Sequence, residues 1–324
     1  MAYKLRDMSR LRRFGIVTIT STLVASILAC PREKVRTNPG GTASTTPLAA
    51  TDTAEPPDTL VHWDSAAGPA LVLSMDSLPD TISVIRPEYT EGRYSDTTMV
   101  DLRSLSHTRF DLFGRGGGFG SVMLTTSSLR WHAGSSDDDC VQWPTAAIAP
   151  ARRGWHVALQ AGTATAIPLD SISAMSPGDS ALFVAQVTRI ASFLPKSPDP
   201  AFQAVPVTVR SAYRFQTAVI DGVIASLQRN IPSEATAREE DVFLIAERPV
   251  GSSQDYQVAF FTRVDGKERD ATVADVLALV TLTRNGRLAV IVSDEDEDGG
   301  TIGWIERAAP RQWGMTWRSA YIGC

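Results

Sequence analysis

From about residue 106 onward, the chain consists of short apolar runs separated by turn-forming residues. The runs are rich in Val, Ile, Phe, Trp and Thr, and Gly, Asn, Asp or Pro lies between them. This pattern predicts β-strands, and connections too short for helical crossovers predict antiparallel pairing. The predicted strands are 106–113, 119–127, 140–148, 154–161, 205–215, 218–228, 241–248, 255–264, 275–283, 287–293, 301–307 and 313–321.

The predicted strands group into three sets of four, at 106–161, 205–264 and 275–321. Antiparallel sets of four are typical of propeller blades, but a closed propeller needs about four or more blades. A sandwich or two packed meanders is the alternative. The sequence therefore predicts a mainly β fold of antiparallel four-stranded meanders, either propeller-blade-like or sandwich-like.

One amphipathic helix is predicted near residues 177–194. Ser176 can cap its start, Pro177 suits the first helical position, and Asp179 suits the first turn. Apolar residues then recur at helical spacing, which favours a face that packs on the core. This stripe consists of Leu182, Phe183, Val187, Ile190, Ala191 and Leu194.

The first 29 residues have the pattern of a secretory signal peptide. Five basic residues and one acidic residue are followed by an uncharged segment from Phe14 to Ala29. A basic start and a short apolar region are typical of export signals. A membrane-spanning helix needs about 20 apolar residues, so this segment is predicted to be a signal peptide and not a span.

The residues at the predicted cleavage site, Ile27-Leu28-Ala29-Cys30, resemble the lipobox of bacterial lipoproteins. Its pattern is an aliphatic residue, a variable residue, a small residue and cysteine, although Leu28 is bulkier than usual. The resemblance implies a diacylglycerol on the Cys30 sulfur, cleavage before it, and a further acyl chain such as palmitate on the new amine. The alternative is an ordinary secreted protein cut nearby, for instance after Ser26.

The lipobox implies where the mature chain resides. Two or more acyl chains anchor a protein stably in a membrane. Pro31 follows Cys30, where lipoproteins retained at the inner membrane often carry Asp. The chain is therefore predicted to be exported and lipid-anchored in the cell envelope, with the outer membrane favoured, on its periplasmic or its surface face.

The charge of the mature chain limits its partners. Removing residues 1–29 removes five basic residues and one acidic residue, which changes the net charge from -5 to -9. An acidic chain without a basic cluster is a poor candidate for binding nucleic acid or an anionic lipid surface. Its membrane contact is therefore expected to run through the lipid anchor only.

The rest of the chain divides into three predicted regions. Residues 30–59 are rich in Pro and Thr, with few large apolar residues, and are predicted to be a disordered tether. Residues 60–200 form an N-terminal β-rich region with the helix. Residues 201–324 form a C-terminal β-rich region, and the boundary lies in a proline-rich loop near residue 200.

Two cysteines remain besides the lipidation candidate. Cys140 and Cys324 are predicted to form a disulfide, because an exported chain enters an oxidising compartment. A cross-link that closes so long a loop contributes roughly 5 kcal/mol in the ideal chain-entropy treatment. The alternative is two unpaired, buried cysteines.

An acidic run offers the only candidate cofactor, a calcium ion. Asp294, Asp296, Asp298 and Gly299 match the first half of a calcium loop, D-x-D-x-D-G. The second half departs from the pattern, because Ile305 stands where an EF-hand needs Glu. A solvated hairpin turn is the alternative.

Residues 275–317 resemble an FG-GAP repeat, in which a strand, an Asp-rich loop, a strand and a hairpin with aromatic ends follow one another. In that family, a D-x-D-x-D-G-x-x-D loop holds calcium. Three of the four acidic positions carry Thr or Ala here and the fourth carries Asn, so this loop is not expected to bind calcium. The matching positions are Thr281, Thr283, Asn285 and Ala289, with Gly286 kept.

No assembled catalytic set is visible in the sequence. The four histidines lack metal-ligand spacing, and neither a G-x-S-x-G nor an S-x-x-K motif occurs. The glycines from Gly114 to Gly120 predict a hairpin or a bulge, and not a phosphate loop. Glu239, Glu240 and Asp241 open a predicted strand, but no cleft is identifiable from the sequence.

These observations favour a non-enzymatic binding or scaffolding module of the cell envelope, with an envelope protein or a glycan as its partner. One alternative is an envelope hydrolase whose site forms only in the fold. The other is a calcium-stabilised adhesive domain. Tryptophans at strand ends are compatible with a sugar-binding surface, although core packing is the favoured interpretation.

Overall fold

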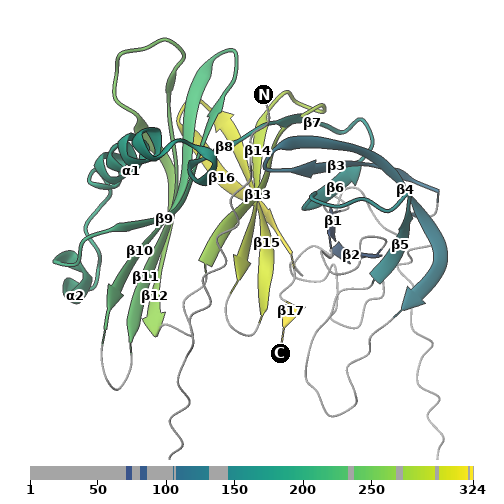
Figure 1. The fold of residues 1–324 in the computed structure, drawn as a ribbon, viewed down its shortest axis with the longest axis horizontal. Helices are drawn as coiled ribbons and strands as arrows, with labels where there is room; N and C mark the ends of the chain where they lie inside the picture. Colours follow the sequence, from purple (N-terminus) through teal and green to yellow (C-terminus); the bar gives the residue numbers. More distant parts are fainter. Residues whose placement is uncertain are drawn as a thin grey trace, which may run out of the picture. The chain divides into compact units, whose positions relative to one another are not determined.

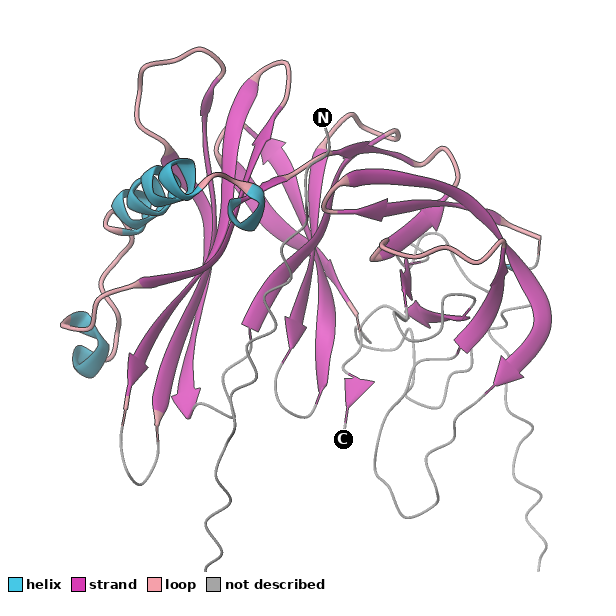
Figure 2. Cartoon of the chain, viewed as in Figure 1, coloured by secondary structure: helices cyan, strands magenta, loops and turns pink. Residues whose placement is uncertain are grey.

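A computed structural model describes residues 71–74, 81–85, 105, 107–130, 145–232, 237–267, 273–295, 299–319 and 322–323. These residues form mainly antiparallel β-structure with few helices, as the sequence predicts (Figure 2). The described strands make one closed barrel and two sheets.

The barrel contains six strands in the order β1-β2-β5-β4-β3-β6. Apolar side chains fill its interior, and Phe110 and Trp155 are fully buried there. The glycine cluster forms the β3–β4 hairpin, in which Gly114 pairs with Gly117, so the predicted hairpin is confirmed. The strands are β1 (Leu71–Ser74), β2 (Thr81–Ile85), β3 (Arg109–Gly114), β4 (Gly117–Arg130), β5 (Thr145–Ala149) and β6 (Val157–Gln160).

The first sheet, called the helix-side sheet, has the order β12-β11-β10-β9-β8. Its four long strands form a plain antiparallel meander, in which each strand pairs with the next along the chain. Its members are β8 (Asp170–Ser171), β9 (Thr208–Gln216), β10 (Ile220–Ile231), β11 (Arg238–Pro249) and β12 (Gln257–Lys267).

The second sheet, called the barrel-side sheet, has the order β16-β15-β14-β13-β7, and β17 also pairs with β15. It contains the second meander, β13 to β16. Its members are β7 (Ala164–Ile167), β13 (Val273–Leu282), β14 (Leu288–Glu295), β15 (Gly299–Ala309), β16 (Gln312–Arg318) and β17 (Ile322–Gly323).

Two of the three predicted sets of four strands are therefore meanders, and these two pack face to face as a sandwich. Side chains of both sheets share one apolar cluster, in which Phe215 and Trp313 meet edge to face with their ring centroids 6.5 Å apart. The first predicted set differs, because β6 pairs with both β3 and β1 and so closes a barrel. The predicted strands do not include β1, β2, β7, β8 or β17.

Apolar residues cover both faces of both sheets. In β14, Val290 and Val292 face the helix-side sheet, whereas Ala289 and Ile291 face the barrel. Successive side chains of a strand point to opposite faces. A strand that is buried on both faces therefore appears in the sequence as a continuous apolar run.

Gly222 in β10 allows an aromatic ring to lie across the strand. It pairs with Phe215 of β9, and a Cβ atom at residue 222 would lie 2.0 Å from the Phe215 ring. Any larger side chain at residue 222 would therefore push Phe215 out of the cluster between the sheets.

Helix α1 (Pro177–Ala191) covers the outer face of the helix-side sheet (Figure 1). The hydroxyl of Ser176 accepts a hydrogen bond from the backbone N–H of Asp179, as predicted for the cap. Phe183, Val187, Ile190 and Ala191 of the apolar stripe are buried and Leu194 is half-buried, but Leu182 is 71% exposed and lies on the solvent side, contrary to the prediction. Its helical neighbours at i+4 and i+7 are Gln186 and Arg189, so this side of the helix is polar.

Two shorter helices flank α1, namely η3 (Ile172–Ala174) and α2 (Pro200–Gln203). Within the described ranges, no helix has the length and apolar character needed to cross a bilayer.

Candidate functional site

A cavity of about 270 Å³ lies between the two sheets at one end of the sandwich. It is found where β11 and β13 begin and β12, β14 and β16 end. One part of its wall is apolar, and the other carries hydroxyl and charged groups. The lining residues are Ser226, Leu227, Asp241, Val242, Phe243, Phe260, Thr262, Val264, Ala274, Val292, Asp294, Thr301, Ile305, Met315 and Arg318.

The alternation of β11 places Asp241 in this cavity. Phe243 belongs to the cluster between the sheets, whereas Val242 packs toward α1. Side chains two residues apart share a face, so Asp241 faces the barrel-side sheet together with Phe243. Glu240 faces the other way, together with Val242. The adjacent acids of the sequence are thus separated onto two faces.

Asp241 is a buried carboxylate with an unused acceptor. The residue is 7% exposed, and its Oδ2 atom has no hydrogen-bond partner. Burial is the main cause that raises the pKa of Asp241, and the hydrogen bond and charge of Glu239 add to it, which brings the pKa to about 7. Both protonation states are therefore populated near neutral pH.

Glu239 lies on the same face as Asp241, but it has partners. The Gln228 side chain donates to its Oε1 atom, and Nη1 of Arg210 lies 3.9 Å from the same oxygen. The positive charge of Arg210 is thus closest to Glu239, and Asp241 remains the acceptor that faces the cavity.

Asp294 reaches the same cavity from β14 in the opposite sheet. Burial raises the pKa of its carboxyl group, and the charge of Arg318 partly offsets this effect. The Nη2 atom of Arg318 lies 3.5 Å from Oδ2 of Asp294. The cavity therefore has one carboxylate from each sheet, with a guanidinium group beside the second.

Asp294 is also the first residue of the predicted calcium loop. Asp296 and Asp298 lie outside the described residues, so this loop stays a prediction. In the part of the chain that the structure describes, no three His, Cys, Asp or Glu side chains gather closely enough to hold a metal ion.

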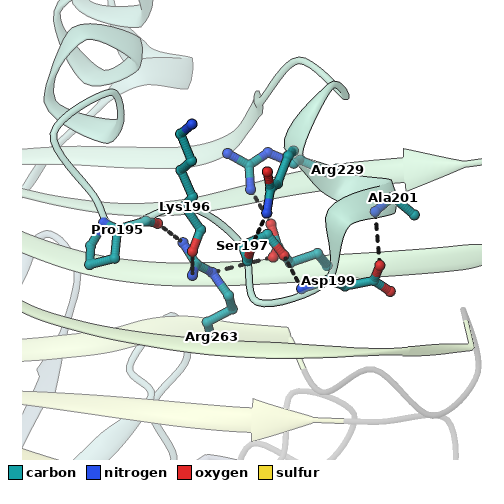
Figure 3. A network of polar contacts seen from close by, with 9 residues as sticks. Pro195, Lys196, Ser197, Asp199, Ala201, Arg229 and Arg263 are labelled. Atoms are coloured by element: carbon teal, nitrogen blue, oxygen red, sulfur yellow. Dashed lines mark hydrogen bonds and ion pairs between the residues drawn. The ribbon is translucent and has the colours of Figure 1, made fainter.

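On the outer face of the same strand, Glu240 belongs to a network of buried ion pairs, in which its Oε1 atom accepts no hydrogen bond but lies 3.3 Å from Nε of Arg263. Its side chain is completely buried and pairs with Arg229 and Arg263. Arg263 also donates to the backbone oxygens of Pro195, at 2.7 Å, and Lys196, at 3.1 Å (Figure 3). This network attaches the segment after α1 to the sheet and is structural.

The same segment is shaped by local hydrogen bonds. The backbone N–H of Asp199 donates to the Ser197 hydroxyl at 3.2 Å, and the Asp199 carboxylate caps α2 by accepting from the N–H of Ala201 at 2.8 Å (Figure 3). The Ala201 hydrogen bond, followed by that from Arg238, lowers the pKa of Asp199.

Glu247 lies at the opposite end of β11 and joins the two sheets. Its carboxylate accepts hydrogen bonds from Nε and Nη2 of Arg307, both at 2.8 Å, from the indole of Trp313 at 2.9 Å and from the backbone N–H of Arg311 at 2.6 Å. Burial acts to raise the pKa of Glu247, but these donors outweigh it and hold the pKa below its ordinary value.

The other predicted site residues fall outside this region. Cys30, Cys140 and Cys324 lie outside the described residues, so lipidation and the disulfide stay predictions. The described tryptophans pack into apolar clusters, as favoured. They are Trp155 inside the barrel, Trp304 and Trp317 between barrel and sheet, and Trp313 between the sheets.

Comparison with protein families, with curated proteins and with solved structures finds no match to this chain. The geometry itself is therefore the basis for a function. It offers a small cavity between the sheets, with an apolar wall and a buried hydrogen-bond acceptor, Oδ2 of Asp241, that has no partner among the described residues.

Proposed function

We propose that this chain is an exported, lipid-anchored binding module of the cell envelope, and that the cavity between its sheets takes a small ligand. The observation that carries the proposal is the Oδ2 atom of Asp241, which is buried in the cavity wall without a hydrogen-bond partner.

A buried carboxylate oxygen without a hydrogen-bond partner is costly, so the Oδ2 atom of Asp241 needs an explanation. Nearly all buried polar groups in folded proteins have hydrogen-bond partners, and burying one without compensation costs about 1 to 3 kcal/mol or more. On the same strand, both carboxylate oxygens of Glu247 accept hydrogen bonds, and the charge of Glu240 is compensated by ion pairs with Arg229 and Arg263. A ligand that donates a hydrogen bond to Asp241 would supply the partner that the fold withholds.

The cavity is suited to holding such a ligand. Binding sites for small molecules are concave and mostly apolar, with a few polar groups that fix orientation. Phe243, Phe260 and Ile305 supply apolar wall, and Asp241 supplies the orienting group. Because the sheets pack on the helix and on the barrel, the walls belong to rigid elements.

A fragment screen on the full chain tests the binding proposal. Chemical-shift or thermal-shift changes should appear for some small fragments, and Ala274→Phe should remove them because it fills the cavity. Ala181→Phe introduces the same ring on the exposed side of α1 and is the matched control. Fragments that bind wild type and the Ala274→Phe variant equally would place binding elsewhere, and the proposal would be wrong.

The lipid anchor belongs to the same proposal and rests on the Ile27-Leu28-Ala29-Cys30 pattern. Metabolic labelling with palmitate should mark wild type, and Cys30→Ser should remove both the label and the chain from the membrane fraction. A Cys30→Ser variant that stays labelled would exclude the lipobox interpretation.

An envelope hydrolase is the second candidate, because two carboxyl groups with raised pKa values face one cavity. A carboxyl group with a pKa near 7 is suited to general acid catalysis at neutral pH. Chromogenic glycosides and esters test this candidate. Turnover that Asp241→Asn abolishes supports it, and the absence of turnover by the full chain across both substrate classes removes it.

A further inference from the structure

Resting on the proposed binding function, we infer that the ligand of the cavity is a small organic amine, whose ammonium group is bound by Asp241 and whose apolar body packs against the aromatic wall.

The first argument is the hydrogen-bonding character of the site. An ionised carboxylate only accepts hydrogen bonds, and an ammonium group only donates them. The Ser226 hydroxyl does not compete for Asp241, because it already donates to the backbone oxygen of Ala274 in the opposite sheet. The free Oδ2 atom of Asp241 is therefore available to a donor that comes from outside the chain.

The second argument is charge. The cavity wall carries Asp241 from one sheet and Asp294 from the other, and Arg318 is the one basic residue among its described lining residues. With both acids ionised, the wall has one uncompensated negative charge. A monovalent cation neutralises this charge, whereas an anionic ligand would add to the repulsion between the acids.

The third argument concerns shape and the apolar wall. A volume of about 270 Å³ corresponds to roughly nine water molecules at about 30 Å³ each, which suits an amine of similar atom count. Phe243 and Phe260 lie in the wall, with ring centroids 6.5 Å apart. Aromatic rings pack against hydrocarbon and also attract cations.

A divalent metal ion fits this wall less well. Calcium takes about six to eight oxygen ligands, but much of the wall is hydrocarbon and Arg318 places a positive charge beside Asp294. Among the residues that the structure describes, no metal-binding group of three acids, histidines or cysteines is present.

Amine binding should be coupled to a proton. The groups facing Asp241 are Glu239 on its own strand, Arg210 on β9, and Asp294 and Arg318 from the barrel-side sheet. Burial and Glu239 hold the pKa of Asp241 at about 7, and a bound ammonium favours the ionised carboxylate. The affinity for an amine should therefore rise with pH through about 7, as the proton leaves Asp241.

The test uses the full chain in mild detergent and three probes of one shape, namely cyclohexylamine, cyclohexanol and cyclohexanecarboxylate. Binding is measured by calorimetry or by ligand-observed NMR at about pH 5.5 and about pH 8. We expect saturable binding of cyclohexylamine, roughly thirtyfold tighter at the higher pH because the ionised fraction of Asp241 rises by that factor. We also expect at least about tenfold weaker binding of cyclohexanol and the carboxylate.

Two variants decide whether Asp241 is the binding group. Asp241→Asn should weaken cyclohexylamine binding by at least about tenfold and remove its pH dependence. Asp265→Asn makes the same chemical change at an exposed position on the outer face of β12, opposite Glu240, and should leave binding unchanged. Thermal melts of both variants confirm that they fold.

The outcomes separate this inference from the proposed function. Equal binding of cyclohexylamine by wild type and Asp241→Asn, or equally tight binding of cyclohexanol, overturns the amine inference. If Ala274→Phe still abolishes the binding of cyclohexylamine or cyclohexanol in that case, the cavity remains a ligand site and the proposed function stands. Binding of calcium chloride that displaces the amine also overturns the inference, in favour of a divalent ion.

Discussion

Asp241 and Glu247 are two carboxylates on one strand, on one face and buried to a similar degree, yet their surroundings are opposite. Glu247 accepts four hydrogen bonds from Arg307, Trp313 and the backbone of Arg311. Asp241, at the other end of β11, has a free oxygen and an acidic neighbour in Glu239. The pKa of Glu247 is lowered as a result, and that of Asp241 is raised.

This difference separates a carboxylate that holds the fold together from one that is available to a ligand. Burial disfavours the charge of both groups, so burial alone cannot distinguish them. The distinguishing feature is whether the opposite sheet supplies donors. It does so at Glu247, where β15 and β16 carry Arg307 and Trp313, and it does not at Asp241, where the sheets separate around the cavity.

The largest expected effect on stability is at Glu247, whose carboxylate accepts four hydrogen bonds. Glu247→Ala leaves the buried Arg307 guanidinium without its partner, so the free energy of unfolding should fall by about 3 to 5 kcal/mol. Urea denaturation of the full chain measures it. A loss below about 1 kcal/mol would show that Glu247 does not join the sheets, and would remove one side of the comparison.

The next effect is expected at Asp241, beside the cavity, where a substitution should raise the free energy of unfolding. Asp241→Asn removes a buried charge, so it should raise the free energy of unfolding by about 1 to 3 kcal/mol at about pH 8. At about pH 5 the wild-type carboxyl is protonated in the folded chain, and the variant should differ little. A variant that is destabilised at about pH 8 would contradict an unpartnered Asp241.

The sign of the pH dependence follows from the raised pKa. Between about pH 4 and about pH 7, the unfolded chain has lost the Asp241 proton while the folded chain keeps it. Stability contributed by this group therefore falls as the pH rises through that window and is constant above it. Asp241→Asn should remove this slope.

Glu247 should change the free energy of unfolding with pH in the opposite direction and to a smaller extent. Its pKa is lowered in the folded chain, so its contribution is present above the unfolded pKa and is lost as the pH falls through the folded pKa. Unfolding measured at acidic pH should show a fall in stability that is shallower in Glu247→Gln. Equal slopes in wild type and variant would contradict the lowered pKa.

The smallest effect is expected for an exposed pair. Arg189 and Asp255 lie 2.7 Å apart with about 65% and 60% of their side chains exposed. Asp255→Ala should change the free energy of unfolding by less than about 0.5 kcal/mol. This variant is the reference for Glu247→Ala, and a loss of comparable size in both would show that burial does not set the strength of these pairs.

The sequence locates the local elements well. All twelve predicted strands are present with shifted ends, and α1 begins at Pro177 after the Ser176 cap, as its capping pattern indicates. These features depend on side chains only a few residues apart. The strands β1 and β2 are not predicted, although β5 and β6 are equally short. The barrel closes because β6 pairs with both β1 and β3, and the pattern along the chain does not specify such pairing.

The candidate site was only partly visible. Glu239, Glu240 and Asp241 stood out as adjacent acids, and Asp294 as part of an acidic run. Strand alternation was the signal that could have separated Glu240 from Asp241, because Val242 and Phe243 continue the two faces. Nothing local to these residues indicates that Asp241 and Asp294 meet across one cavity.

The amino-acid sequence by itself was sufficient to place the strands, the helix and its cap, because those elements arise from short-range periodicity and hydrogen bonding. Only the packing of the two meanders decided which carboxylates receive donors. Arg307 reaches Glu247 across 60 residues of sequence, while no comparable donor among the described residues reaches the free oxygen of Asp241. Contacts between residues so far apart in the sequence depend on how whole sheets pack. Tertiary structure therefore decides that Glu247 receives hydrogen-bond donors and that Oδ2 of Asp241 does not.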